Sequence, residues 1–94
     1  MVFLPAPPEE RQVNFEYSDP KAKAVWVAGS FNYWNPKASP LRNLGAGRWG
    51  LQLTLEPGRY EYRFLVDRHW TIDPAARQQV TDFCGGVNSV LVVE

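Results

Sequence analysis

The sequence is 94 residues long and contains ten Lys plus Arg and ten Asp plus Glu residues, so its formal net charge is zero. This length allows one domain with a modest core. The charge balance argues against the basic surface with which proteins bind the phosphate backbone of nucleic acids. Four Trp, four Tyr and five Phe residues are more aromatic rings than so small an interior needs.

The residues that carry most enzyme chemistry are scarce in this chain. Cys84 is the only cysteine and His69 the only histidine, so an internal disulfide is impossible and a zinc site would lack ligands. His69 belongs to no acid-base or nucleophile motif, and we expect no enzyme activity, no metal and no cofactor. The first residues lack a basic region and a long apolar run. We therefore expect neither a signal peptide nor a membrane span, and a reduced, cytoplasmic setting.

The start of the chain predicts an arm and two strands. Residues 1–10 are rich in proline and end in two acids, and we expect an extended arm before a domain of residues 11–94. Polar and apolar residues alternate over residues 11–17, as in a half-buried strand, and a second strand is expected over residues 24–29. The turn residues that follow leave Trp34 on a loop. A large ring on a loop indicates recognition more than packing.

The middle of the chain predicts a loop followed by a strand with one apolar face. Residues 35–47 are rich in Pro, Asn, Gly and Ser and show little periodicity, so we expect mostly loop. Within this loop Leu41 and Leu44 are expected to point inward. Residues 49–55 alternate like a strand, and Trp49 shares the apolar face with leucines, which assigns it to the core.

The second half of the chain predicts further short strands. Residues 56–58 form a turn short enough for a hairpin, whose second strand would be residues 59–66. A brief strand is expected over residues 70–72, a loop over residues 75–86, and a continuous, central aliphatic strand over residues 87–93. Short strands joined by turn residues, without a strong helix signal, predict a two-sheet antiparallel sandwich.

Several side chains have the chemistry of a sugar-binding surface. A pyranose ring has an apolar face of C–H groups and an edge of hydroxyls, so an aromatic plane and planar polar groups bind it together. Trp34 on its loop and Trp70 after a turn are candidates for the aromatic planes. Arg63, on the polar side of its strand, and Asn88 are candidates for the hydroxyl edge.

Four motifs give the chain a resemblance to a known family. They read GSFNYW at residues 29–34, GRYEYRFLVD at residues 58–67, WTIDP at residues 70–74 and VNS at residues 87–89. In this order they resemble the glycogen-binding domain of the AMP-activated protein kinase β subunit. That domain belongs to the family 48 carbohydrate-binding modules, which also occur at the N-termini of isoamylases and branching enzymes. The similarity covers nearly the whole chain.

The resemblance implies an all-β, immunoglobulin-like antiparallel β-sandwich of the early-set type. It implies non-catalytic binding of α-1,4-linked glucan, as a polysaccharide such as glycogen or starch or as a maltooligosaccharide. Trp34 and Trp70 match the family's ligand-stacking tryptophans. Arg63 stands where the kinase domain has a lysine, and Asn88 matches an asparagine that bonds sugar hydroxyls.

The chain departs from the family's pattern in two places. The family has a leucine that reaches through the bend of the glucan, followed two residues later by a threonine. Here Phe83 or Cys84 takes the leucine's place and Gly86 the threonine's, so one hydroxyl contact is lost and the ring of Phe83 is a candidate substitute. The family's Asp-Gly turn reads Asp67-Arg68, which strains a type I′ turn and suggests another turn type.

A second function remains open from the sequence. The same sandwich could be a regulatory or docking domain with a decayed sugar surface, in contact with a glycan-active enzyme or a kinase-like partner. Trp26 points away from its apolar neighbours and is expected to be exposed, where it could contact a partner. Stacking of single-stranded nucleic acid on the tryptophans is disfavoured by the zero net charge, and no membrane contact is expected.

Overall fold

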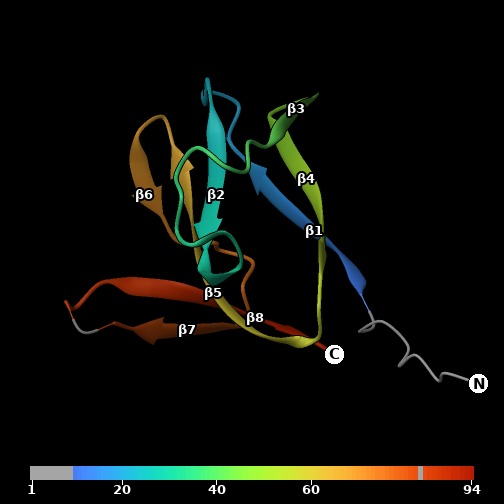
Figure 1. Ribbon diagram of the computed structural model, residues 1–94. Helices are drawn as coiled ribbons and strands as arrows, with labels where there is room; N and C mark the ends of the chain where they lie inside the picture. Colours follow the sequence, from blue (N-terminus) through green and yellow to red (C-terminus); the bar gives the residue numbers. More distant parts are fainter. Residues whose placement is uncertain (1–9, 83) are drawn as a thin grey trace, which may run out of the picture.

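The computed structural model describes residues 10–82 and 84–94, which form two antiparallel β-sheets packed face to face (Figure 1). One sheet has the strand order β1–β4–β3, formed by Arg11–Ser18, Arg48–Leu55 and Arg42–Gly45. The other has the order β2–β5–β8–β7, formed by Val25–Gly29, Gly58–Val66, Val87–Val93 and Gln78–Thr81; the short β6, His69–Thr71, pairs with β5. The predicted β-sandwich is confirmed. Most of the predicted arm, residues 1–9, lies outside the described residues.

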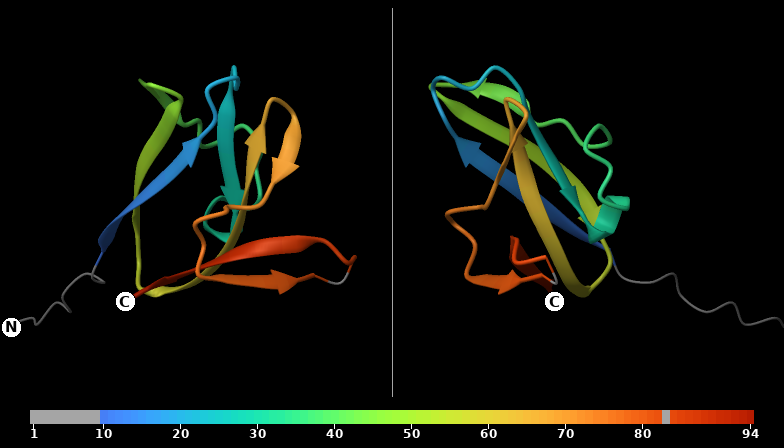
Figure 2. Two further views of the ribbon diagram at one scale, coloured as in Figure 1. Left: turned by 180° about the vertical axis from the view of Figure 1, so that it is seen from behind. Right: turned by 90° about the vertical axis from the view of Figure 1, so that its left-hand side faces the viewer.

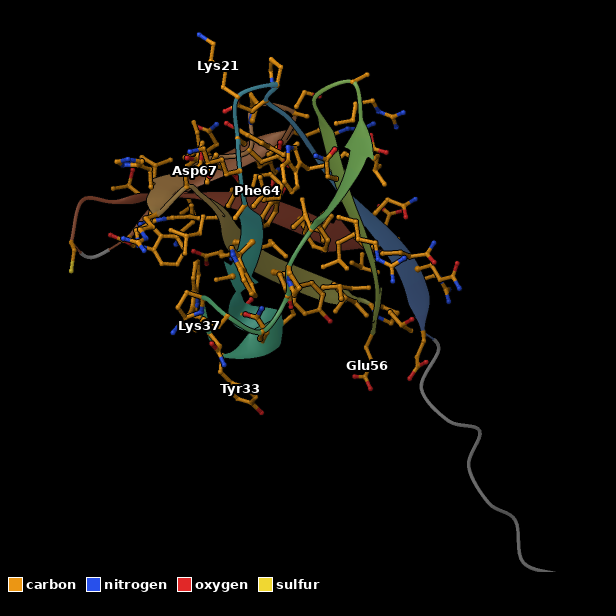
Figure 3. The ribbon with its side chains drawn as sticks, turned by 90° about the horizontal axis from the view of Figure 1, so that it is seen from above. Lys21, Tyr33, Lys37, Glu56, Phe64 and Asp67 are labelled. Carbon is orange, nitrogen blue, oxygen red and sulfur yellow. The ribbon has the colours of Figure 1, made fainter. Side chains whose placement is uncertain are left out.

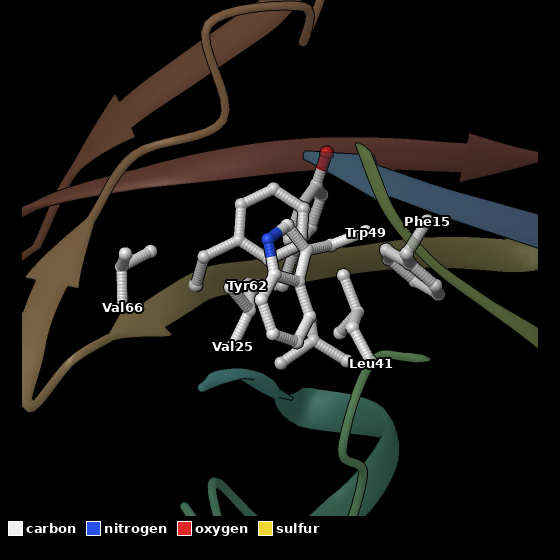
Figure 4. Packing of buried hydrophobic residues seen from close by; sticks show 8 residues of the cluster. Phe15, Val25, Leu41, Trp49, Tyr62 and Val66 are labelled. Atoms are coloured by element: carbon white, nitrogen blue, oxygen red, sulfur yellow. The ribbon is translucent and has the colours of Figure 1, made fainter. Parts of the chain in front are cut away.

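The core lies between the two sheets and follows the alternation of each strand (Figure 4). Phe64 in β5 is fully buried, and its ring centre lies 5.2 Å from that of Tyr17 and 5.9 Å from that of Tyr62. Burying an apolar side chain of this kind contributes about 1.5–3 kcal/mol. The prediction that Trp49 belongs to the core is confirmed. The buried cluster consists of Phe15, Val25, Val27, Leu41, Trp49, Tyr62, Phe64 and Val66.

The predicted hairpin at residues 56–58 is wrong, because β4 and β5 belong to different sheets. β4 pairs with β1 and β3, whereas β5 pairs with β2, β6 and β8. The turn carries the chain from one sheet to the other, as the yellow segment in Figure 2 shows. Both strands have one apolar face, and placing them in opposite layers buries the two faces against each other. The Tyr60 hydroxyl donates a 2.7 Å hydrogen bond to the Glu56 carbonyl across this corner.

Two strands occur where loop was predicted, and both are short. β3 is exposed along its whole length and pairs with β4, and β7 pairs with β8. Neither shows a clear apolar alternation, since backbone pairing rather than burial holds these edge strands. Leu41 is buried as predicted, but Leu44 in β3 is 51% exposed, so its predicted inward position is wrong. β8 lies between β5 and β7, which confirms the predicted central strand.

The turn at Asp67-Arg68 has positive φ angles at both residues, as a type I′ turn does, so the expected change of turn type is wrong. Asp67 and Arg68 have φ angles of 46° and 71°, and positive φ at both central residues is the signature of a type I′ turn. Asp67 offsets the strain, because its Oδ1 accepts hydrogen bonds from the backbone N–H groups of Lys23 and Ala24, each 2.9 Å long. These two hydrogen bonds also lower the pKa of the Asp67 carboxyl.

Candidate functional site

The outer face of the five-stranded sheet carries an open hollow of about 430 Å³ beside β5. Residues from η1 (Ser30–Asn32), the loop after it, β5, β6 and the β7–β8 region line this hollow. Four residues that the sequence singled out for sugar binding therefore meet at one place. The lining consists of Ser30, Trp34, Glu61, Arg63, Trp70, Asp82 and Asn88.

Asn32 fixes the loop that carries Trp34. Its Oδ1 accepts a 2.9 Å hydrogen bond from the backbone N–H of Gly29, and its Nδ2 donates to the Val27 carbonyl and the Ser39 hydroxyl, each at 3.1 Å. The backbone N–H of Trp34 donates to the Gly29 carbonyl at 2.9 Å. The Trp34 indole, 38% exposed, is therefore presented by a hydrogen-bonded loop rather than a loose one.

The same loop holds backbone strain. Tyr33 and Trp34 have φ angles of 57° and 56°, the left-handed region, which costs about 1–2 kcal/mol for a residue other than glycine. Below them the ring of Phe31 packs against that of Phe15, with 5.3 Å between ring centres, and anchors the segment. Tyr33 is 96% exposed and projects from the edge of the molecule (Figure 3). Strain of this kind clusters at binding and catalytic sites.

Trp70 reaches the hollow through the type I′ turn between β5 and β6. The turn folds β6 back along β5, where Trp70 pairs with Leu65. Leu65 alternates with the buried Phe64 and Val66, so the pair lies on the outer face of the sheet. The indole of Trp70 is 49% exposed.

A chain of hydrogen bonds holds the polar side chains of the hollow. Arg63 donates from Nε to Oδ1 of Asn88 at 2.6 Å and from Nη2 to Oδ2 of Asp82 at 2.8 Å. Asn88 in turn donates from Nδ2 to Oε1 of Glu61 at 3.0 Å, and Oε2 of Glu61 accepts from Nη1 of Arg59 at 2.9 Å. The hydrogen bonds from Asn88 and Arg59 lower the pKa of the Glu61 carboxyl. The guanidinium of Arg63 is thereby fixed in one plane beside the indoles.

Asp82 joins this network to the loop before β8. Its Oδ1 accepts hydrogen bonds from the backbone N–H groups of Cys84 and Gly86, at 2.9 and 2.8 Å. A Cβ atom at Gly86 would overlap the Arg63 guanidinium and lie 2.9 Å from Oδ2 of Asp82. The Arg63–Asp82 ion pair therefore fills the space of a side chain at the position where the resemblance places a threonine.

Two further candidates from the sequence remain, Cys84 and Phe83. Cys84 is exposed and is absent from the lining of the hollow. Phe83 lies outside the described residues.

Sequence reasoning missed three residues of the lining. Glu61 shares the outward face of β5 with Arg63, and that period-two spacing was signal enough to include it. Ser30, whose hydroxyl accepts a 3.2 Å hydrogen bond from the Glu61 N–H, had no comparable signal. Asp82 lies at the end of a stretch predicted as loop, and only the tertiary fold places it beside Arg63.

A metal site and a membrane-spanning helix are two further kinds of feature that the described residues could contain. Residues 10–82 and 84–94 contain no group of three or more His, Cys, Asp or Glu side chains that could hold a metal ion. No helix among these same residues has the length and apolar character needed to cross a membrane.

Comparison with known proteins identifies the family. Residues 11–94 match the family model described as the glycogen recognition site of AMP-activated protein kinase. The chain belongs to this family. It is thus a carbohydrate-binding module domain, and the resemblance found in its four motifs is confirmed.

Individual relatives agree with this assignment. The β-1 subunit of 5′-AMP-activated protein kinase from Bos taurus is 35% identical over 91 residues, which is 95% of this chain and 31% of the relative. Protein PTST homolog 2, chloroplastic, from Arabidopsis thaliana is 32% identical over 72 residues, 77% of this chain and 13% of the relative. A maltogenic amylase from S. marinus superposes with a TM-score of 0.71 at 26% identity, covering 88% of this chain and 13% of the amylase. The chain therefore spans less than a third of each of these proteins.

Proposed function

We propose that this chain binds α-1,4-linked glucan, such as glycogen or starch, by stacking sugar rings on Trp34 and Trp70, and that it does so without catalysis. The observation that carries the proposal is that two half-exposed indoles and a fixed guanidinium border one hollow. Indole planes cover the apolar C–H face of a pyranose, and the planar polar groups between them meet its hydroxyl edge. The family description names glycogen recognition and supports the same ligand class.

The polar groups have different roles in this proposal. Nη1 of Arg63 makes no hydrogen bond within the described residues, so it is available to a sugar hydroxyl. Asn88 is only 5% exposed, and both ends of its amide already bond to neighbours. Asn88 therefore acts mainly by positioning Arg63 and Glu61, rather than through the direct sugar contact that the resemblance implies. Carboxylate oxygens of Glu61 and Asp82 accept hydrogen bonds from the remaining hydroxyls.

The chain is also proposed to recruit a partner protein to the glucan. A domain that binds the polymer without cleaving it would hold a glycan-active enzyme or a kinase-like partner close to glucan, and we place this role in the cytoplasm. Relatives that are much longer than this chain, among them a kinase subunit, support the idea of a partner.

Affinity gel electrophoresis tests the proposal, with glycogen or amylopectin in the gel and cellulose as the control polymer. The parent protein should be retarded by the α-glucans alone, with a dissociation constant in the micromolar to millimolar range, about 4–8 kcal/mol. Trp34→Ala and Trp70→Ala should each abolish retardation, because a shallow platform depends on both planes. Leu44→Ala removes an exposed side chain of the other sheet and is the matched control.

The outcome decides between the two functions left open by the sequence. If both tryptophan variants migrate like the parent while remaining folded, the hollow is not the glucan site. If the parent is not retarded at all, the glucan function is wrong.

A further inference from the structure

The outer face of the five-stranded sheet continues into a second hollow of about 770 Å³ that the proposed stacking site does not use. Its apolar lining includes Leu65 of β5, Pro36 of the loop that follows Trp34, and Trp26 of β2. Trp26 is half-buried, so the prediction that it is exposed is wrong, but part of its side chain borders this hollow. Lys37, from the same loop, also lines this hollow and lies near the edge of the molecule in Figure 3.

The two hollows are connected by one row of side chains. Leu65 pairs with Trp26 on one side and with Trp70 on the other. Directly paired residues of an antiparallel sheet point to the same face, so all three lie on the outer surface. With neighbouring strands about 4.8 Å apart, the row extends the apolar platform by roughly 10 Å beyond the first hollow.

The rim of the second hollow offers hydrogen-bond donors. Lys23, Lys37 and Arg68 contribute to its lining, and within the described residues none of these three side chains forms an ion pair. The carboxylate among them, that of Asp67, already accepts two backbone hydrogen bonds. Lys23 also interacts electrostatically with this carboxylate. The surface therefore combines an apolar floor with exposed N–H donors of Lys37 and Arg68, which is the chemistry that suits the face and edge of a sugar ring.

We propose that this second hollow holds a further stretch of the same α-glucan chain. The inference rests on the proposed function, and the continuity of Trp70, Leu65 and Trp26 carries it. A glucan that stacks on Trp34 and Trp70 passes over Leu65 onto Trp26, with ring and hydroxyl oxygens accepting from the cationic rim. Affinity should then rise with the length of the glucan, and Trp26 should account for most of that rise.

Calorimetric titration with maltotriose, which is too short to cover both hollows, and with a longer linear maltodextrin tests this inference. Trp26→Ala should weaken binding of the longer chain about threefold to tenfold, because one stacking plane is lost. Binding of maltotriose should stay within about twofold of the parent, since the first hollow is intact. Val92→Ala, at an exposed position on the outer face far along β8, is the control variant. A longer glucan chain can bind in more registers, and the control shows how much of the difference in affinity between the two ligands comes from this alone.

A second variant guards against loss of the fold. Arg68 has a φ of 71°, and glycine adopts such an angle without penalty, so Arg68→Gly removes a rim donor while relieving strain. It should weaken binding of the longer chain about twofold to threefold and leave binding of maltotriose unchanged.

Three results would overturn the inference. One is a folded Trp26→Ala protein that binds both ligands like the parent, which leaves the glucan function intact. Another is an equal loss for both ligands, which would place Trp26 in the first site. The third has two parts: the parent protein binds an acidic peptide that Lys37→Glu no longer binds, and it binds the longer glucan no more tightly than the short one. This result would make the hollow a protein contact. Absence of all oligosaccharide binding in the parent would instead refute the proposed function itself.

Discussion

The outer faces of the two sheets differ in how their polar side chains are held. On the five-stranded sheet an unbroken series of hydrogen bonds, 2.6–3.0 Å long, runs from Arg59 to Asp82 through the side chains between them. On the three-stranded sheet Arg48 and Glu16 form an isolated pair at 3.5 Å, and both side chains are more than half exposed. Exposed single pairs of this kind contribute little to stability.

The difference shows that a β-sandwich does not become a binding surface through its fold alone. Both sheets have the same backbone chemistry, but within residues 10–82 and 84–94 the outer face of the five-stranded sheet links its polar side chains in one network, whereas the other face has separate pairs. Asn88 lies almost buried in the middle of that network and restrains Arg63 and Glu61 together. Side chains that are already ordered lose less entropy on binding, so this face can bind a ligand that makes few strong contacts, such as a sugar.

Glycine replacement should give the largest contrast between the sheets. A Cβ atom at Gly29 would lie 2.5 Å from the Glu61 carbonyl oxygen and 2.8 Å from the Tyr62 Cβ, so Gly29→Ala should lower the free energy of unfolding by about 2–3 kcal/mol. In the other sheet Gly50→Ala meets the tip of Leu44 at 2.8 Å, a partly exposed side chain that can move away. Its cost should stay below about 1 kcal/mol. Urea denaturation measures both, and equal losses would contradict the contrast.

Removing the side-chain amide of Asn88 should have the second-largest effect on stability. Asn88→Ala leaves Arg63 and Glu61 without their shared partner, and we expect a loss of about 2 kcal/mol in unfolding free energy together with weaker glycogen binding. Gln52→Ala breaks the exposed 3.3 Å hydrogen bond to Asn14 on the other sheet and should cost about 0.5 kcal/mol or less. The comparison fails if Gln52→Ala is as costly, or if Asn88→Ala binds glycogen like the parent.

Acid should weaken the fixed face. Hydrogen bonds from Asn88 and Arg59 lower the pKa of Glu61 in the folded state. Its contribution to stability is therefore complete above the ordinary glutamate value of about 4.3 and is lost as the pH falls through the lower folded value. Unfolding midpoints in urea, followed from neutral pH into acid, should drop in this region. For Glu61→Gln the unfolding midpoint should fall less steeply with pH, because only the effect of Asp67, whose pKa is also lowered, remains. If the midpoint of Glu61→Gln falls as steeply as that of the parent, Glu61 is not a cause.

The smallest effect is expected for the isolated pair on the three-stranded sheet. Arg48→Ala should change the unfolding free energy by no more than about 0.5 kcal/mol, because both partners are solvated. Retardation by glycogen should be the same as for the parent protein. A loss above about 1 kcal/mol would mean that this face, too, is held by coupled side chains.

Much of the fold was predictable because strand signals are local. Alternation placed β1, β4 and β5 and assigned Trp49 to the core, since the period of two is written in consecutive residues. The motifs that carry Trp34 and Trp70 indicate the family from residue types and spacing alone. β3 and β7 were missed because edge strands are held by backbone pairing, which leaves no pattern in the side chains.

The strand-rich architecture, the family and the two tryptophans could be predicted from residue types, because each depends on side-chain chemistry and short spacing. The positions of β4 and β5 in opposite layers, and the contact of Asp82 with Arg63, which is 19 positions away in the chain, follow from how the strands pack. Such contacts depend on which strands pair and in which register, and many arrangements of the same strands share one local pattern. The grouping of charges around the indoles is therefore a property of the packed sheets rather than of any single motif.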